Sequence, residues 1–315
     1  MRYRIKHSTE YIYNAKVSHC YNVAHIIPRT SSRQTCLWSE VKVEPLAAIS
    51  SKQEDYYGNM AFHFEIQQPH TRLMITATSE VETHSQLSTS PLLTQTQSQG
   101  PGSQSIQQLV MPFPQEKGLS WLDALKRLAE AHSPEDLLAR EYLFDSPMIQ
   151  ATEALRAYAE PSFGNDRPLL AAVKDLTQRI FTDFTYDPQS TTVSTPLAEV
   201  LATKRGVCQD FAHLQIGCLR ALGIPAKYVS GYIETIPPAG TIKLVGTDAS
   251  HAWISVYSPL DGWIEFDPTN NCTAGTQHII TAWGRDYFDV TPLRGVIYGG
   301  GTGPVMNISV DVARR

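Results

Sequence analysis

Cys208 stands at the start of a predicted helix, a position that favours the reactive form of a thiol. Residues 208–222 carry apolar side chains at helical spacing, and Gly223 and Pro225 follow and end the pattern. Unpaired backbone N–H groups and the helix dipole stabilise a thiolate there and can also donate to an oxyanion. The preceding Gly206 leaves room for a substrate backbone. Cys208 is therefore predicted to be a nucleophile, although a small buried residue at a helix start gives the same local pattern.

A predicted hairpin over residues 251–267 places a histidine opposite a carboxylate. The apolar residues of its two strands must share the face that points to the core, and this matching places Ile254 opposite Ile264. In the same register His251 lies directly opposite Asp267, on the face away from the apolar core. Directly opposed side chains have Cβ atoms roughly 4.5–5.5 Å apart, so the Asp267 carboxylate can fix the tautomer and orientation of the imidazole.

These three residues together form the set that thiol catalysis requires. Cys208 is the expected nucleophile, His251 the base, and Asp267 the group that orients the base. A lone histidine near a strand start is more often a residue of the surface or the core edge. The combination within residues 208–267 predicts a catalytic triad that acts through a thioester intermediate.

Three further residues are candidates for the oxyanion site or the pocket. Tyr186 has a hydroxyl to donate, although a buried tyrosine that ends a helix is an equal alternative. Gln209 follows the nucleophile directly, and Trp253 follows His251 closely enough to shape a cleft or simply to pack. Asp210 would repel a thiolate, so we expect it instead to cap backbone N–H groups of the first helical turn.

No metal or cofactor site is predicted. The five cysteines are few, odd in number and without a CxxC pair, which indicates neither a disulfide framework nor structural zinc. Cys218 falls on the apolar face of the helix and should be an inert core thiol, and His213 is too far along the helix to be the base. The glycine-rich run 299–303 lacks the ending of a phosphate-binding loop, and no acidic loop has calcium-binding spacing.

The beginning of the chain indicates β-structure. From Tyr3 to Tyr13 apolar and polar residues alternate with a period of two, as in a strand half buried on an antiparallel sheet. Residues 55–59 supply turn chemistry between two later strands. A β-rich N-terminal domain is therefore expected over residues 1–82. Its further strands are predicted at 37–43, 62–66 and 73–81.

A linker and a helical region are expected over residues 83–164. Ser, Thr and Gln dominate residues 83–105, which are too poor in apolar side chains to offset the entropy of ordering. Capping residues just before a proline predict one helix start at Ser133 and another at Asp145.

The remaining chain mixes helices and strands, and its catalytic core is expected over residues 165–290. One helix should start at 165–168 and carry a buried face, and a shorter one should run from Thr195 to Gly206. Residues 291–315 form a C-terminal strand segment. The strands of these two parts are predicted at 226–235, 251–257, 263–267 and 305–312.

Composition narrows the class of protein. The 315 residues carry 26 basic and 31 acidic side chains, a net charge of −5 without a basic block, which argues against nucleic acid and anionic lipid as partners. No run reaches the roughly 18 apolar residues of a membrane span. Because Met1 to Tyr13 alternates charged and aromatic residues where a signal peptide is apolar, a cytoplasmic location is expected.

Several stretches around the triad form a known pattern: Gly206 to His213, Arg220 to Ala226, Ser230 to Tyr232, His251 to Trp253 and Phe266 to Thr269. They resemble the transglutaminase-like superfamily, in particular its bacterial branch described as cysteine proteases. The resemblance covers residues 165–270. It implies a papain-like core that runs nucleophile helix, histidine strand, aspartate strand, with the same roles for Cys208, His251 and Asp267.

The start of the chain is similar to the β-rich domain that accompanies this core in bacteria, through Ile27-Pro28-Arg29, Gln34, Pro45, Asp55 and Gly58-Asn59. The expected fold class is therefore α+β, with a papain-like, transglutaminase-type core preceded by a β-rich N-terminal domain and a helical connecting region. Members of the superfamily include crosslinkers, proteases, amidases and proteins without catalysis, so the resemblance leaves the reaction open.

We expect a cysteine-dependent hydrolase that acts on a peptide, amide or isopeptide bond of a peptide or protein substrate, without calcium. Acyl transfer to an amine is the alternative from the same chemistry, and a non-catalytic peptide-binding module is the alternative from another class. Trp253 and Trp263 flank the hairpin, but no second aromatic cluster near Cys208 can be assigned to the apolar tunnel that shields a thioester from water. Hydrolysis is therefore favoured. The oligomeric state is not indicated.

Overall fold

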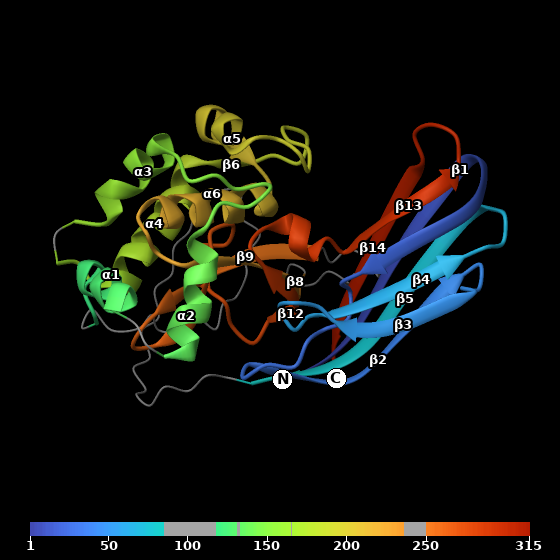
Figure 1. The fold of residues 1–315 in the computed structure, drawn as a ribbon, viewed down its shortest axis with the longest axis horizontal. Coiled ribbons are helices and arrows are strands. Elements are labelled where there is room, and N and C mark those ends of the chain that lie inside the picture. Colours follow the sequence, from blue (N-terminus) through green and yellow to red (C-terminus); the bar gives the residue numbers. More distant parts are fainter. Residues whose placement is uncertain (85–117, 131–132, 165, 236–249) are drawn as a thin grey trace, which may run out of the picture.

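The computed structural model describes residues 1–84, 118–130, 133–164, 166–235 and 250–315. They form a long bent β-sheet beside a core of helices and a second sheet, which confirms the expected α+β class (Figure 1). The linker predicted over residues 83–105 lies almost wholly outside the described residues. Among the helices of the described residues, none is both long and apolar enough to cross a membrane.

The long first strand, β1 (Arg2–Ala24), organises the bent sheet. Its first half pairs with β5 (His70–Thr83) and β14 (Val305–Arg314), and its second half pairs with β4 (Met60–Ile66) and β13 (Leu293–Gly299). Strand β2 (Gln34–Glu44) lies outside β5, and β3 (Ile49–Glu54) lies outside β4. The C-terminal segment of the chain is thus part of the sheet that its first residues form.

The second sheet has the strand order β11-β10-β9-β8-β12. Its bounds are β8 (Ala226–Ile233), β9 (Ser250–Ser258), β10 (Gly262–Asp267), β11 (Cys272–Thr273) and β12 (His278–Gly284). Helix α6 (Cys208–Ala221) packs on one face of this sheet and buries Phe211 and Leu214 in the same cluster as Tyr228 and Ile254. The helix and the sheet therefore fix the start of α6 relative to the start of β9.

The other elements surround α6. They are α1 (Trp121–Glu130), α2 (Pro134–Arg140), α3 (Glu153–Ala159), α4 (Leu169–Asp183), α5 (Leu197–Thr203), the short strands β6 (Thr185–Tyr186) and β7 (Arg205–Gly206), and the 3-10 turns η1 (Glu141–Leu143), η2 (Glu160–Ser162) and η3 (Tyr287–Val290). In α4 the apolar positions expected to face the core are buried, from Leu169 to Ile180. This helix therefore packs as its sequence predicts.

Two predicted helix boundaries are wrong. Helix α2 does begin after Ser133, as predicted. No helix begins at Asp145, because residues 146–149 form a turn there. The Asp145 carboxylate accepts the backbone N–H of Ala151, just beyond that turn. Helix α3 begins later, after the capping residue Thr152. Asp-Ser-Pro suits a turn as well as a helix start, and here the turn satisfies the aspartate. Helix α5 ends at Thr203 rather than at Gly206, followed by a left-handed residue.

The β9–β10 hairpin has the predicted faces but a different register. Ile264 pairs with Val256 rather than with Ile254, so the pairing is shifted by two residues. The reason is the turn, because Ser258 and Gly262 pair with each other and the loop between the strands is shorter than predicted. Since the shift is even, each side chain stays on its predicted face of the sheet.

Side-chain amides of the N-terminal region cover one edge of β12. The Gln34 amide accepts the N–H of Ile280 at 2.8 Å and donates to the carbonyl of the same residue at 2.7 Å. The Asn59 amide makes the same pair of bonds with Trp283, at 2.9 and 2.8 Å. Each amide replaces a neighbouring strand and satisfies backbone groups that an open sheet edge leaves unpaired. Gln34 and Asn59, both quoted above for the resemblance of the N-terminal domain, therefore join the bent sheet to the core.

Candidate active site

Cys208 is the first residue of α6, as predicted, and Asp210 fixes the loop that leads to it. One Asp210 carboxylate oxygen accepts the N–H of Val207 at 2.8 Å and the hydroxyl of Thr191 at 2.6 Å. Gly206 permits this arrangement, because a Cβ there would lie 2.8 Å from the Asp210 carboxylate. Asp210 thus caps the helix as expected. The position of the aspartate side chain thus requires glycine at residue 206.

His251 and Asp267 are both buried and form a short hydrogen bond. His251 Nε2 donates to Asp267 Oδ2 at 2.7 Å, although the two residues are diagonal rather than directly opposed across the strands. Burial lowers the pKa of His251, but the Asp267 carboxylate outweighs burial and raises it to about 10, with Cys208 acting in the same direction. The ring is therefore an imidazolium at neutral pH. Its Nδ1 is the nitrogen that can exchange a proton with Cys208.

Asp267 is fully buried and accepts five hydrogen bonds. Oδ1 accepts the backbone N–H groups of Thr269 and Asn270 at 2.9 and 3.1 Å. Oδ2 accepts from the side chains of Asn270, His251 and His278. Burial raises the pKa of Asp267, but the two histidines outweigh burial and hold that pKa well below its usual range. The aspartate is therefore a fixed anion.

His278 is a residue that sequence reasoning missed. Its Nδ1 accepts the N–H of Gly275 at 3.2 Å, so the ring proton is on Nε2, which donates to Asp267 at 3.1 Å. Burial is the main cause that lowers the pKa of His278, which keeps the ring neutral. The strand that carries it, β12, was not predicted, and two other strands, β9 and β8, separate it from β10 in the sheet. No local pattern of the sequence indicates this contact.

The same cluster is also the place where a metal would find ligands. His251, Asp267 and His278 bring three ligand atoms within 4.8 Å of one another. However, both imidazoles donate ring protons to the carboxylate, and an ion would have to displace those protons. The hydrogen bonds of these three side chains therefore suit an orienting network better than a metal site.

Trp253 packs beside His251, which is the packing alternative of its prediction. The indole is fully buried, with its centroid 5.9 Å from that of the His251 ring and an interplanar angle of 28°. Its Nε1 donates to Glu265 at 2.6 Å, and Glu265 forms an ion pair with Arg33 at 2.6 Å. The orientation of the imidazole thus depends, through Trp253 and Glu265, on a residue of the N-terminal region.

The two other candidates lie on either side of the nucleophile. Tyr186 pairs with Gly206 through β6 and β7 and is 54% exposed, so it is not the buried tyrosine of the alternative. Burial and the neighbouring Cys208 raise its pKa, which keeps its hydroxyl protonated as a donor. Gln209 lines the cavity beside the sulfur and donates to the carbonyl of Val193 at 3.0 Å.

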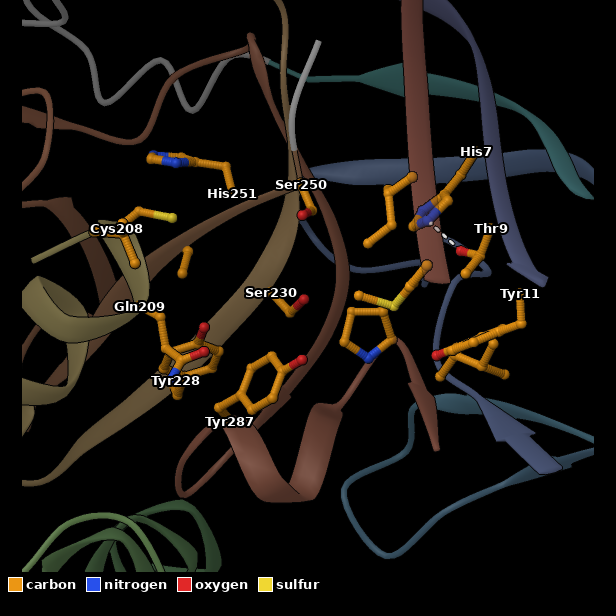
Figure 2. A pocket seen from close by; sticks show the side chains of 16 residues that line it. His7, Thr9, Tyr11, Cys208, Gln209, Tyr228, Ser230, Ser250, His251 and Tyr287 are labelled. Atoms are coloured by element: carbon orange, nitrogen blue, oxygen red, sulfur yellow. Dashed lines mark hydrogen bonds between the residues drawn. The ribbon is translucent and has the colours of Figure 1, made fainter. Parts of the chain in front are cut away.

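A cavity of about 240 Å³ opens beside Cys208. In Figure 2, Cys208 and His251 lie at one end of it, and His7, Thr9 and Tyr11 of β1 lie at the other. Tyrosines from three elements line it, namely Tyr11, Tyr228 and Tyr287. These residues meet only through the tertiary fold, which brings aromatic side chains to the cavity from segments far apart in the sequence.

His213 and Cys218 have the roles expected for them. Buried His213 accepts the N–H of Tyr287 at 3.1 Å, and burial lowers its pKa to about 3, so it is neutral and positions η3. Burial raises the pKa of the Cys218 thiol to about 12. Neither residue takes part in the site around Cys208.

Comparison with known families gives the class of protein. Residues 3–82 match the bacterial transglutaminase-like N-terminal region, and residues 156–268 match the transglutaminase-like superfamily. The chain belongs to the transglutaminase-like superfamily, with the N-terminal region that its first residues resemble. The site described above thus lies in the part of the chain that defines the superfamily.

Individual proteins resemble the chain to different extents. An uncharacterized protein of Mycobacterium tuberculosis is 41% identical over 318 residues, which is 99% of this chain and 92% of that protein. The protein-glutamine gamma-glutamyltransferase of Pseudomonas aeruginosa is 33% identical over 127 residues, 38% of this chain and 17% of the enzyme. The crystal structure of a "putative cysteine protease" from Cytophaga hutchinsonii matches with a TM-score of 0.70 at 21% identity. The match covers 99% of this chain and 90% of the Cytophaga chain, so the two proteins share a fold.

Proposed function

We propose that the protein is a cysteine-dependent hydrolase of peptide, amide or isopeptide bonds. The observation that carries this proposal is the position of Cys208 at a helix start beside His251, whose ring is held by the buried anion Asp267. The imidazolium stabilises a thiolate next to it, and the first N–H groups of α6 are available to an oxyanion.

The chemistry follows from these three side chains. The Cys208 thiolate attacks the carbonyl carbon, and His251 gives its Nδ1 proton to the leaving nitrogen as the C–N bond breaks. The product is a thioester on Cys208 and a free amine. Water then attacks the thioester, His251 takes one of its protons, and the carboxylic acid leaves as the C–S bond breaks. Asp267 keeps the ring oriented throughout and does not change its own protonation.

Acyl transfer to an amine is a second candidate, and two observations favour it. The tyrosines around the cavity offer partial shielding of a thioester, and the gamma-glutamyltransferase of Pseudomonas aeruginosa resembles part of this chain. We retain hydrolysis as the first choice because Ser230, Ser250 and Tyr287 line the cavity with hydroxyls that can bind water.

Alkylation of the cysteines tests whether Cys208 is a nucleophile. Iodoacetamide at about pH 6 to 7 should modify Cys208 well before buried Cys218, because Cys208 is partly exposed and lies beside an imidazolium. Mass spectrometry of tryptic peptides measures each rate. Slow and equal labelling of all five cysteines would contradict the proposal and favour a non-catalytic binding module.

A competition experiment separates the two reactions. Casein is incubated with the protein and a large excess of a fluorescent primary amine, with and without a chelator. Hydrolysis predicts new carboxyl groups and little fluorescence on casein, unchanged by chelation, and no reaction with the Cys208→Ala variant. Dominant amine incorporation would establish the transferase instead, and loss of activity on chelation would overturn calcium independence.

A further inference from the structure

One face of the bent sheet contacts the core at one end and separates from it at the other. Tyr3 and Ile5 of β1 and Val310 of β14 pack there against Tyr232 and Ile279 of the core. Since side chains two apart share a face, the next residues along β1 on this face are His7, Thr9 and Tyr11. These residues line the cavity beside Cys208.

Strand β14 continues the same wall. Ile308 pairs with Thr9 and Met306 pairs with Tyr11, so both side chains point to the cavity face of the sheet. Each side chain is 51% exposed. This is unusual for two neighbouring apolar side chains, because the same face of the sheet is buried against the core near Val310. The cavity is thus lined by the nucleophile and, on the wall built by β1 and β14, by a half-exposed apolar pair.

The charge of the cavity limits what it can bind. Among the described residues that line it, none is an aspartate, glutamate, lysine or arginine. His7 has hydrogen bonds at both ring nitrogens, with Tyr232 and Thr9, and burial lowers its pKa to about 4, so it is neutral. A charged side chain that packed against the wall built by β1 and β14 would lose hydration and find no counter-charge there, since the imidazolium of His251 lies at the other end of the cavity.

The size of the cavity agrees with a single side chain. Its volume of about 240 Å³ is below the roughly 300–1,000 Å³ of pockets that enclose a small molecule. Because the cavity is continuous with Cys208, a side chain placed in it belongs to a residue next to the carbonyl that the sulfur attacks.

We propose that the cavity between β14 and α6 is a subsite for an uncharged, apolar side chain of the acyl donor, selected by Met306 and Ile308. The proposal rests on the proposed function, since it assigns the specificity of the same site. It gives the bent sheet a direct role in substrate recognition, with the second wall of the subsite built by the last strand of the chain.

The test uses peptidyl chloromethyl ketones that differ only in the side chain next to the ketone, namely Leu, Lys or Asp. The Cys208 thiolate forms a C–S bond as the C–Cl bond breaks and chloride leaves, and mass spectrometry gives the rate. The wild-type protein should react at least about tenfold faster with the Leu reagent than with the Lys or Asp reagent. The Ile308→Glu and Met306→Glu variants should lose this preference and react faster with the Lys reagent.

The matched control is Val305→Glu. Val305 is also exposed and on β14, but alternation places it on the opposite face of the sheet. Its rates should equal those of the wild type. Iodoacetamide separates the two proposals, because failure to label Cys208 rejects the nucleophile itself. Normal iodoacetamide labelling without a preference for Leu, or with the preference intact in both glutamate variants, would overturn the subsite alone.

Discussion

At the scale of single residues, the site is a balance of charges around one buried carboxylate. Asp267 faces an imidazolium, His251, and a neutral imidazole, His278. The imidazolium supplies the counter-charge, and the neutral ring supplies only a hydrogen bond. Without Asp267 the dominant effect on His251 is burial, which favours the neutral ring. The protonation state of the base is therefore set by the aspartate and not by the histidine itself.

Asp267→Asn tests this dependence. The variant should lower the pKa of His251 below neutral pH and reduce turnover by about 10³- to 10⁴-fold, because the base loses both its charge and its orientation. Alkylation of Cys208 by iodoacetamide should also move to higher pH. The control is Asp261→Asn, since the carboxylate of this exposed residue accepts from Ser258 in the hairpin turn and, within the described part of the chain, contacts no residue of the triad. Unchanged pH dependence of alkylation in Asp267→Asn would reject the assigned role.

At the scale of elements, the start of α6 and the start of β9 meet at the site. The cap made by Asp210 places Cys208, and Trp253 holds the ring at the beginning of β9. Both supports are hydrogen bonds made by buried side chains: Asp210 accepts the N–H of Val207, and Trp253 donates to Glu265. The geometry of the nucleophile and the base is thus fixed by residues that do not touch a substrate.

Gly206→Ala should disturb this arrangement. The new Cβ would lie 2.8 Å from Asp210 and push the carboxylate away from Val207, which moves Cys208. We expect a loss of about 10²-fold in kcat/KM and of about 1–3 kcal/mol in unfolding free energy. Gly164→Ala is the control, since no atom lies within 4 Å of its Cβ position. Full activity of Gly206→Ala would show that the cap is dispensable.

At the scale of the whole molecule, the bent sheet and the core share one buried polar interface. Gln34 and Asn59 complete the edge of β12, and His7 of β1 bonds the hydroxyl of Tyr232 of β8 at 2.8 Å. His7 is neutral because it is buried, as is His213 inside the core. The stability of the assembled fold therefore depends on keeping these rings unprotonated.

Stability should fall as the pH falls from 6.5 towards 4. Burial lowers the pKa of His7 from 6.5 to about 4 in the folded protein. Between these two pH values the unfolded chain binds a proton at His7 and the folded chain does not, so acid favours the unfolded state. At pH 5 the expected loss from His7 is about 2 kcal/mol, and His213 acts in the same direction. His251 has a raised pKa, so its contribution is complete below 6.5 and is lost as the pH rises through about 10.

Urea unfolding at pH 7 and pH 5 measures this loss. The His7→Gln variant keeps groups that can bond Tyr232 and Thr9 but does not titrate, so it should lose about 2 kcal/mol less than the wild type between the two pH values. The comparison is made within each protein, so an overall difference in stability does not affect it. Equal pH dependence in both proteins would show that His7 is not protonated on unfolding.

The sequence by itself determined the local features of the site. The helix that begins at Cys208 follows from apolar spacing and from the residues that end it, and the buried face of α4 follows in the same way. The alternation of β1 and the faces of the β9–β10 hairpin are also local, because side chains in a strand alternate whatever the register. His251 and Asp267 could therefore be placed on one face before their pairing was known.

Only the tertiary structure decided which distant residues complete the site. His278 comes from a strand and Arg33 from a turn that no periodicity connects to the triad. The true hairpin register depends on where Ser258 and Gly262 close the turn. The cavity wall at Met306 forms because the last strand returns to pair with the first. Such contacts arise from packing between segments far apart in the chain, and the pattern of neighbouring residues carries no record of them.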